Sequence, residues 1–177
     1  DEALLWIIGF KLCGPICRFR FKIIADGNRI GATPIGKIGI RIARAGFGIA
    51  QAASDDTRLK LRDWSLVREA DGHYRASLPA DAFALNLRFA PTQPLLLQGR
   101  QGLSRKGPEP RQASHYYSQP QLQATGRLTI QGRAFDVSGR AWLDHEWSEE
   151  LLHPEAVGWD WVGMNLENGS ALTAFRL

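Results

Sequence analysis

The sequence predicts an antiparallel all-β fold, and two patterns carry this prediction. From residue 58 onward apolar and polar residues alternate with a period of two, which is typical of half-buried strands. Three pairs that suit tight turns separate such segments: Asp71-Gly72, Gln131-Gly132 and Asn168-Gly169. No segment shows a convincing period of 3.6 residues. A barrel or a sandwich is the expected architecture, because both limit exposed strand edges.

The predicted strands follow one another along the chain. Alternation of Arg18, Arg20 and Lys22 with phenylalanines indicates a half-buried strand, with a basic patch for base stacking as the alternative. The later strands are predicted at 59–66, 73–78, 83–89, 122–130, 133–143, 157–166 and 171–177. Residues 91–112 are rich in Gly and Pro and interrupt the pattern, so we expect a long ordered loop or a linker there.

Charge and composition divide the chain near residue 50. The net charge of +4 comes from the first 50 residues, which hold 8 Lys and Arg against 3 Asp and Glu. The remainder is near neutral, so the basic balance does not indicate a nucleic-acid partner. Eleven of the twelve isoleucines lie at or before Ile49. The longest apolar run, residues 3–10, is too short to span a bilayer and lacks the flanks of a signal peptide.

The segment 139–148 holds the densest candidate chemistry. In an extended strand Trp142, Asp144 and Glu146 share one face, while Leu143, His145 and Trp147 share the other. A carboxyl group among aromatic walls is desolvated, which raises its pKa and suits a general acid. The alternative is a structural carboxylate among ordinary core tryptophans. The apolar residues 135, 137, 141 and 143 place Asp144 on the opposite face unless a bulge at Gly139 switches faces.

Other chemistries have weaker patterns. Cys13 and Cys17 form a CxxxC motif without further cysteine ligands, which favours structural or incidental thiols. Asp144 and His145 point to opposite faces of a strand, so we expect no metal site. Ser104 and Ser148 lack a nucleophile-elbow motif. No cofactor is predicted.

Several ordered motifs resemble the AttH-like, carotenoid 1,2-hydratase-related family, whose members are often labelled predicted secreted hydrolases. The motifs are the segments 91–99 and 102–108, Ser114-His-Tyr-Tyr-Ser118, Gly139-Arg-Ala-Trp-Leu-Asp-His-Glu-Trp147 and Val157-Gly-Trp-Asp-Trp161. The resemblance covers about residues 41–177. It implies two lipocalin-like β-barrels, with an incomplete first barrel at 41–147 and a link and the start of the second at 148–177. Residues 1–40 do not match, and we expect them to derive from a frameshifted or rearranged reading frame.

The resemblance also implies a site. The hydratases add water to an isoprenoid double bond without a cofactor, and a relative closes polyketide rings. Their aromatic-x-Asp motif, which protonates the alkene, matches Trp142 and Asp144 here. Glu146 stands where the hydratases have Asn, which favours the AttH-like branch. The expected catalytic residues are Asp144, Glu146 and Trp142, and the expected ligand-binding residues are Tyr116, Tyr117, His145, Trp147, Trp159 and Trp161.

Three functions stay open at this point. The first is acid-catalysed hydration or cyclisation of a hydrophobic unsaturated molecule, with Asp144 as the proton donor. The second is a barrel that binds or carries a hydrophobic small molecule without chemistry. The third is the hydrolase that the family label implies. The resemblance further implies an exported bacterial protein; no oligomeric state is predicted.

Overall fold

The computed structural model describes residues 4–12, 16–25, 40–43, 50–81, 83–148, 153, 155–158 and 160–176, with side chains from residue 50 onward. Within these ranges the chain forms strands and no helix. The strands are β1 (Leu4–Leu12), β2 (Ile16–Ala25), β3 (Ile40–Ala43), β4 (Ala50–Ala52), β5 (Arg58–Leu61), β6 (Trp64–Arg68), β7 (Tyr74–Pro79), β8 (Phe83–Ala90), β9 (Leu96–Leu97), β10 (Leu103–Arg105), β11 (Ala113–Ile130), β12 (Arg133–Ser148), β13 (Asp160–Asn165) and β14 (Ala171–Arg176).

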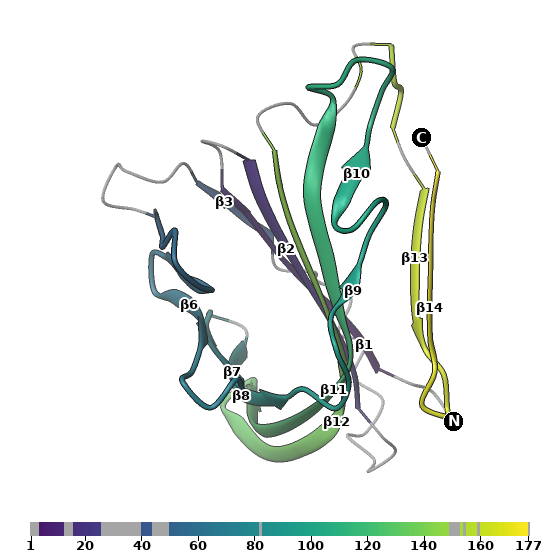
Figure 1. Ribbon diagram of the computed structural model, residues 1–177. Helices are drawn as coiled ribbons and strands as arrows, with labels where there is room; N and C mark the ends of the chain where they lie inside the picture. Colours follow the sequence, from purple (N-terminus) through teal and green to yellow (C-terminus); the bar gives the residue numbers. More distant parts are fainter. Residues whose placement is uncertain are drawn as a thin grey trace.

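Twelve of these strands form one strongly curved sheet (Figure 1). Its order is β3-β1-β2-β12-β11-β8-β7-β6-β5-β4. The short strands β9 and β10 pair with the first part of β11, on the edge opposite β12 that β8 occupies further along. The sheet bends so far that β3 comes close to β5, although these two strands are not paired. The predicted all-β, lipocalin-like fold is confirmed. One detail differs from a purely antiparallel sheet, because β1 and β3 pair in parallel.

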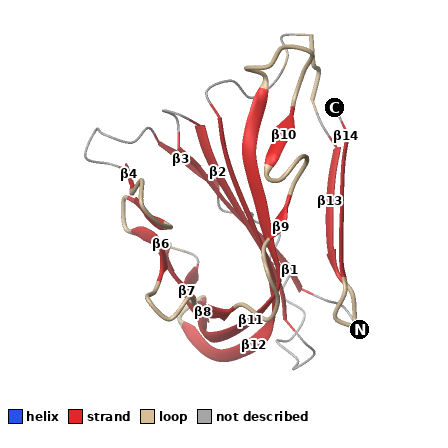
Figure 2. Cartoon of the chain, in the orientation of Figure 1, coloured by secondary structure: helices blue, strands red, loops and turns tan. Residues whose placement is uncertain are grey.

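The strands β13 and β14 form a separate hairpin (Figure 2). The hairpin lies beside the sheet on the side of β9 and β10, and β13 contacts both β11 and β12. Its turn contains the predicted pair Asn168-Gly169, and the other two predicted turns also join antiparallel strands. The glycines at these turns have φ values of 83°, 77° and 86°, a conformation that favours glycine. All three predicted hairpins are therefore confirmed.

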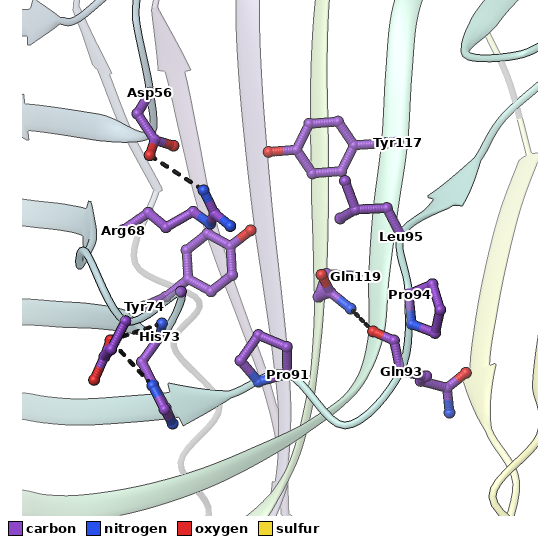
Figure 3. Close-up of a pocket in the computed structure, with 12 residues that line it drawn as sticks. Asp56, Arg68, His73, Tyr74, Pro91, Gln93, Pro94, Leu95, Tyr117 and Gln119 are labelled. Carbon is purple, nitrogen blue, oxygen red and sulfur yellow. Dashed lines mark hydrogen bonds and ion pairs between the residues drawn. The ribbon is translucent and has the colours of Figure 1, made fainter.

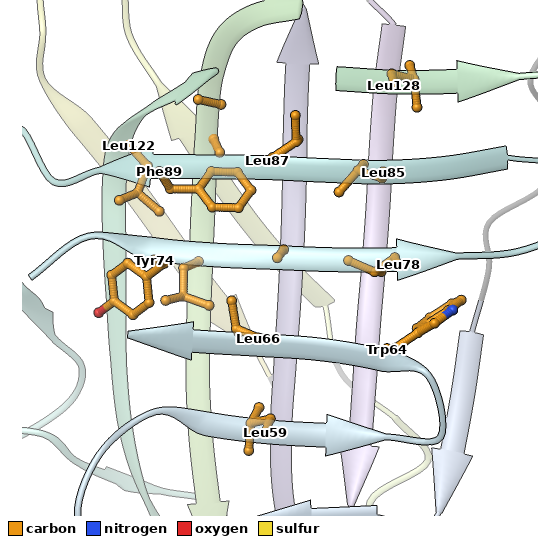
Figure 4. Close-up of a cluster of buried hydrophobic side chains, with 14 of the residues drawn as sticks. Leu59, Trp64, Leu66, Tyr74, Leu78, Leu85, Leu87, Phe89, Leu122 and Leu128 are labelled. Carbon is orange, nitrogen blue, oxygen red and sulfur yellow. The ribbon is translucent and has the colours of Figure 1, made fainter. Parts of the chain in front are cut away.

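The hydrophobic core lies on the concave face of the sheet (Figure 4). Leu66, Leu78 and Leu122 are fully buried there. The indole of Trp64 is also buried, and its Nε1 donates a hydrogen bond to the carbonyl oxygen of Pro79 at 2.8 Å. The other core residues include Leu59, Leu61, Tyr74, Ala76, Leu85, Leu87, Phe89, Ala124, Leu128, Ile130, Ala141 and Leu143. The alternation in the sequence thus reflects burial of one face of each strand.

A β-bulge divides the long strand β11. Gln119 pairs with Leu143 and Leu122 pairs with Ala141, so β11 contains one residue more than β12 between these pairs. Gln121 within the bulge has a φ of 51°. The extra residue shifts the alternation, so even-numbered residues face away from the core before the bulge and toward it afterwards. The bulge lies in β11 and not at Gly139, so Asp144 stays on the face opposite to Leu143.

Candidate functional site

The sheet separates the predicted site residues onto two faces. Cross-strand pairs place Tyr116 opposite Glu146 and Ser118 opposite Asp144, while Tyr117 lies opposite His145 and His115 opposite Trp147. Because neighbouring residues on a strand point to opposite faces, Tyr116 belongs with Asp144 and Tyr117 does not. The sequence predicted the two faces of β12. It also grouped the aromatic residues into one ligand-binding set, and the sheet divides that set between its two faces.

Asp144 lies in a buried polar cluster on the face opposite to the core. Asp144 is only 4% exposed. Three side chains donate hydrogen bonds to its Oδ1: the Ser118 hydroxyl at 2.6 Å, the Trp142 indole at 2.9 Å and the Tyr116 hydroxyl at 3.1 Å. Burial favours a neutral carboxyl group, whereas hydrogen bonds to an oxygen favour the carboxylate. These two effects oppose each other, and carboxyl groups in such surroundings occur both at functional sites and in structural networks.

Trp161 extends this cluster into the β13–β14 hairpin. Its indole Nε1 donates to the Tyr116 hydroxyl at 2.8 Å, and the same hydroxyl donates to Asp144. The rings of Trp142 and Trp161 meet edge to face, with centroids 6.2 Å apart. Burial, together with the nearby charge of Asp144, raises the pKa of Tyr116 far above its ordinary value. Tyr116 therefore stays protonated and acts as a fixed hydrogen-bond donor.

Glu146 lies in a second polar group on the same face. Its Oε1 accepts a hydrogen bond from the Ser114 hydroxyl at 2.6 Å and lies 2.9 Å from Lys106 Nζ. Lys106 is 2% exposed, and its ammonium also contacts the Ser104 hydroxyl at 3.1 Å. The ammonium lies 5.1 Å from the centroid of the Tyr116 ring, so this ring joins the two polar groups. The buried charge of Lys106 is thus compensated by an acid and by aromatic faces.

The bulge in β11 holds the hairpin against this face. The amide of Gln121 donates to Asn165 Oδ1 at 2.8 Å, and its side-chain Nε2 donates to the carbonyl oxygens of Leu166 and Ser170. Arg140 in turn donates to Gln121 Oε1 at 2.6 Å. Trp161 therefore contacts Tyr116 from a hairpin that is anchored near its turn. We call the hydrogen bonds of Gln121 with Asn165, Leu166, Ser170 and Arg140 the bulge clamp.

The opposite face carries an aromatic cluster. Nδ1 of His145 lies 2.8 Å from the Tyr117 hydroxyl, and the ring of Trp147 lies 4.8 Å from His145 and 5.3 Å from His115. Burial lowers the pKa of His145 to about 4, so its imidazole is neutral near pH 7. Burial also raises the pKa of Tyr117. The neutral imidazole and the protonated Tyr117 therefore share a hydrogen bond, whose donor depends on the tautomer of the imidazole.

Tyr117 also borders a pocket of about 560 Å³ between β6, β7 and the loop that follows β8. Figure 3 shows Tyr74 and Arg68 on one side of it and Tyr117 and Leu95 on the other. Its full lining is Asp56, Arg68, Asp71, Gly72, His73, Tyr74, Pro91, Gln93, Pro94, Leu95, Tyr117 and Gln119. Asp144 does not border it. The pocket lies on the concave face of the sheet, and the Asp144 cluster lies on the convex face.

Sequence reasoning missed three residues of the Asp144 face. Lys106 belongs to the segment expected to be a loop, and Ser114 and Ser118 were noted only as parts of a motif. The alternation of the sequence could have identified the two serines, because they share a face with Tyr116 on the strand that pairs with β12. Trp159 lies outside the described residues. Among the described residues, no group of three His, Cys, Asp or Glu side chains is placed to hold a metal ion.

The comparisons with known proteins show the family and the fold of the chain. The model of the AttH-like family matches residues 38–177. The chain belongs to the AttH-like family. A solved structure from Nitrosomonas europaea, provisionally named AttH, is 42% identical in sequence, with a TM-score of 0.73. The alignment covers 98% of this chain and 58% of the other, so the chain spans little more than half of that protein's length. A search of curated proteins gave no match.

The family assignment confirms the predicted resemblance. The structural likeness confirms the lipocalin-like fold, whereas the proposed boundaries at residues 40 and 147 stay predictions. The part of the chain that the structure describes contains no helix long and apolar enough to cross a membrane.

Proposed function

We propose that this AttH-like protein transfers a proton to a hydrophobic unsaturated small molecule, with Asp144 as the donor. The observation that carries the proposal is the convergence of three donors on Oδ1 of a carboxyl group that is 4% exposed. Because these donors occupy Oδ1, the proton of the neutral carboxyl group belongs on Oδ2. The donors fix the orientation of the carboxyl group, as proton transfer requires.

The proposed reaction balances without a cofactor. The Oδ2 proton passes to one carbon of a double bond, and the neighbouring carbon becomes a cation. The ring faces of Trp142 and Trp161 stabilise this positive charge. A water molecule, or a nucleophile within the substrate, then bonds to the cation and loses a proton to the Asp144 carboxylate. Attack by water gives hydration, and attack by the nucleophile within the substrate gives cyclisation. In both cases the neutral carboxyl group of Asp144 is regenerated.

Glu146 and Trp161 have supporting roles in this proposal. Lys106 and Ser114 hold the Glu146 carboxylate in place, and Glu146 shares the face of Asp144. It would orient the attacking water. Trp161, on the hairpin, contacts Tyr116 and Trp142, the two aromatic residues that donate to Asp144. Because Asp144 is so little exposed, substrate entry requires the hairpin to move away from β11 and β12.

The test is turnover by Asp144→Asn on a panel of acyclic isoprenoid alkenes. Hydration is detected as a mass gain of one water molecule in ¹⁸O-labelled water, and cyclisation as a new retention time without mass change. Asparagine keeps an acceptor oxygen for the three donors but carries no transferable acid proton. We expect turnover to be abolished and substrate binding retained. The control Asp136→Asn, exposed on the same strand, should keep full turnover. Full turnover by Asp144→Asn would refute the proposal.

Binding without chemistry is the second candidate function. The pocket of about 560 Å³ beside Tyr117 favours it, because this volume is typical of small-molecule sites. A hydrolase is less well supported. Ser114 and Ser118 donate to carboxylates, whereas a serine nucleophile needs a base such as an imidazole.

A further inference from the structure

The pocket on the concave face has the composition of a site for an amphipathic ligand. We propose that it binds a flat molecule with an apolar part and a single anionic group, and that Arg68 binds this group. The inference extends the second candidate function. It is independent of proton transfer at Asp144, because that residue lies on the other face of β11 and β12.

The walls of the pocket suit a flat apolar body. Tyr74 and Tyr117 present aromatic rings from opposite sides, and Pro91, Pro94 and Leu95 complete the apolar lining (Figure 3). Tyr74 is 2% exposed, and burial raises its pKa far above the ordinary value. Leu95 is 46% exposed. A large apolar side chain exposed at a pocket rim loses contact with water when a ligand covers it.

The charge of the lining places the anionic group at Arg68. Among the described lining residues, Arg68 is the one with a permanent positive charge. Its Nη1 binds Asp56 Oδ2 at 3.2 Å, and both side chains are more than 40% exposed. Such exposed pairs are weak, and a guanidinium has five N–H donors. Arg68 can therefore bind a ligand oxyanion while it keeps or exchanges the contact with Asp56.

The two acidic residues of the lining are already bound by donors. Asp56 accepts a hydrogen bond from the amide of Thr57 at 2.7 Å, besides the contact with Arg68. Asp71 accepts one from the amide of His73 at 3.0 Å and pairs with Arg88. The amide of His73 is the largest cause that lowers the pKa of Asp71. These carboxylates are compensated locally, so they oppose an anionic ligand less than free carboxylates would.

The experiment uses two fluorescent probes that differ by one charge. 8-Anilino-1-naphthalenesulfonate carries a sulfonate, and N-phenyl-1-naphthylamine is the same ring system without it. Titration of the full chain with each probe gives two dissociation constants. We expect Arg68→Gln to weaken sulfonate-probe binding about tenfold and to leave the neutral probe unchanged, because a charge-assisted hydrogen bond is lost. Arg75→Gln, an exposed arginine outside the lining that pairs with Glu69, should change neither.

A second pair of variants tests the site itself. Leu95→Asp should weaken binding of both probes, whereas Leu103→Asp, at a leucine with a similar exposure of 43% outside the lining, should not. Thermal unfolding of each variant checks that it is folded. Equal effects of Arg68→Gln on the two probes, or none, would overturn the role of Arg68. Equal effects of Leu95→Asp and Leu103→Asp would overturn the pocket as the binding site.

Discussion

At the residue scale, the Asp144 cluster combines burial with several donors on one oxygen. Such clusters are sensitive to the loss of a single member, because a buried polar atom that loses its partner is not rehydrated. Ser118 is the clearest case. It is fully buried, and its hydroxyl donates to Asp144 while it accepts from Gln98 Nε2 at 2.9 Å.

We therefore expect Ser118→Ala to lower the free energy of unfolding by about 1–3 kcal/mol, since it leaves two buried partners without this hydroxyl. Urea denaturation followed by tryptophan fluorescence measures the change. Ser170→Ala is the matched control, because Ser170 is exposed and its hydroxyl donates to the nearby Asn168 Oδ1. An equal effect of both substitutions would contradict the importance of the cluster.

His145 gives the protein a predictable pH dependence. Its pKa of about 4 in the folded state lies below the ordinary value of 6.5, and burial is the cause. The unfolded state therefore binds more protons between these values, so stability falls as the pH decreases from 6.5 to 4.

We expect His145→Gln to lose less stability than the wild type over this pH window. Denaturation midpoints at pH 7 and pH 5 measure the difference. His115→Gln provides the control, because His115 is exposed on the neighbouring strand. If the two variants show the same pH dependence, the imidazole of His145 is not the group responsible.

At the element scale, the bulge in β11 decides which residues share a face and also anchors the β13–β14 hairpin. Without the extra residue, either Tyr116 or Leu122 would lie on the wrong face of the sheet. The bulge clamp then holds the hairpin that carries Trp161.

We expect Gln121→Ala to loosen the hairpin while the sheet remains intact. The loss of the side-chain hydrogen bonds to Leu166 and Ser170 should speed local amide exchange in β13 and β14 about tenfold. Hydrogen exchange measured by mass spectrometry compares the exchange rates in β13 and β14 with the rate in β8. Gln131→Ala is the control, because Gln131 also has a positive φ but lies at an exposed turn. Unchanged exchange in β13 and β14 would show that the clamp is dispensable.

At the scale of the whole molecule, one curved sheet supports both candidate sites. The strands β11 and β12 present the Asp144 cluster on one face and Tyr117 with His145 on the other. Both sites therefore depend on the core packed against the concave face, although few of their residues belong to it.

Leu78→Ala tests this dependence, since Leu78 is fully buried in β7 and distant in sequence from Asp144. We expect a loss of about 2–5 kcal/mol in the free energy of unfolding, as is typical for a core leucine. Tryptophan fluorescence and far-ultraviolet circular dichroism should report one shared, shifted transition. Leu97→Ala, at a side chain that is 53% exposed, should shift it little. Separate transitions by the two probes would show that the sites unfold independently of the core.

The all-β class, the three hairpins and the two faces of β12 were predictable from the sequence alone. These follow from local rules, because strand alternation and the positive φ of turn glycines depend on neighbouring residues only. The family motifs also indicated Asp144 as a candidate, with Tyr116 or Tyr117 as its aromatic partner. The predicted frameshift origin of residues 1–40 stays a prediction.

Which residues come into contact depends on the tertiary structure. The bulge at Gln121 changes the face of every residue that precedes it in β11, and its position depends on pairing with β12 rather than on any local signal. Lys106 reaches Glu146 from a segment expected to be a loop, across 40 residues of sequence. The pocket beside Tyr117 likewise requires β6 and β7 to curve toward β11, a consequence of sheet twist that no single strand encodes.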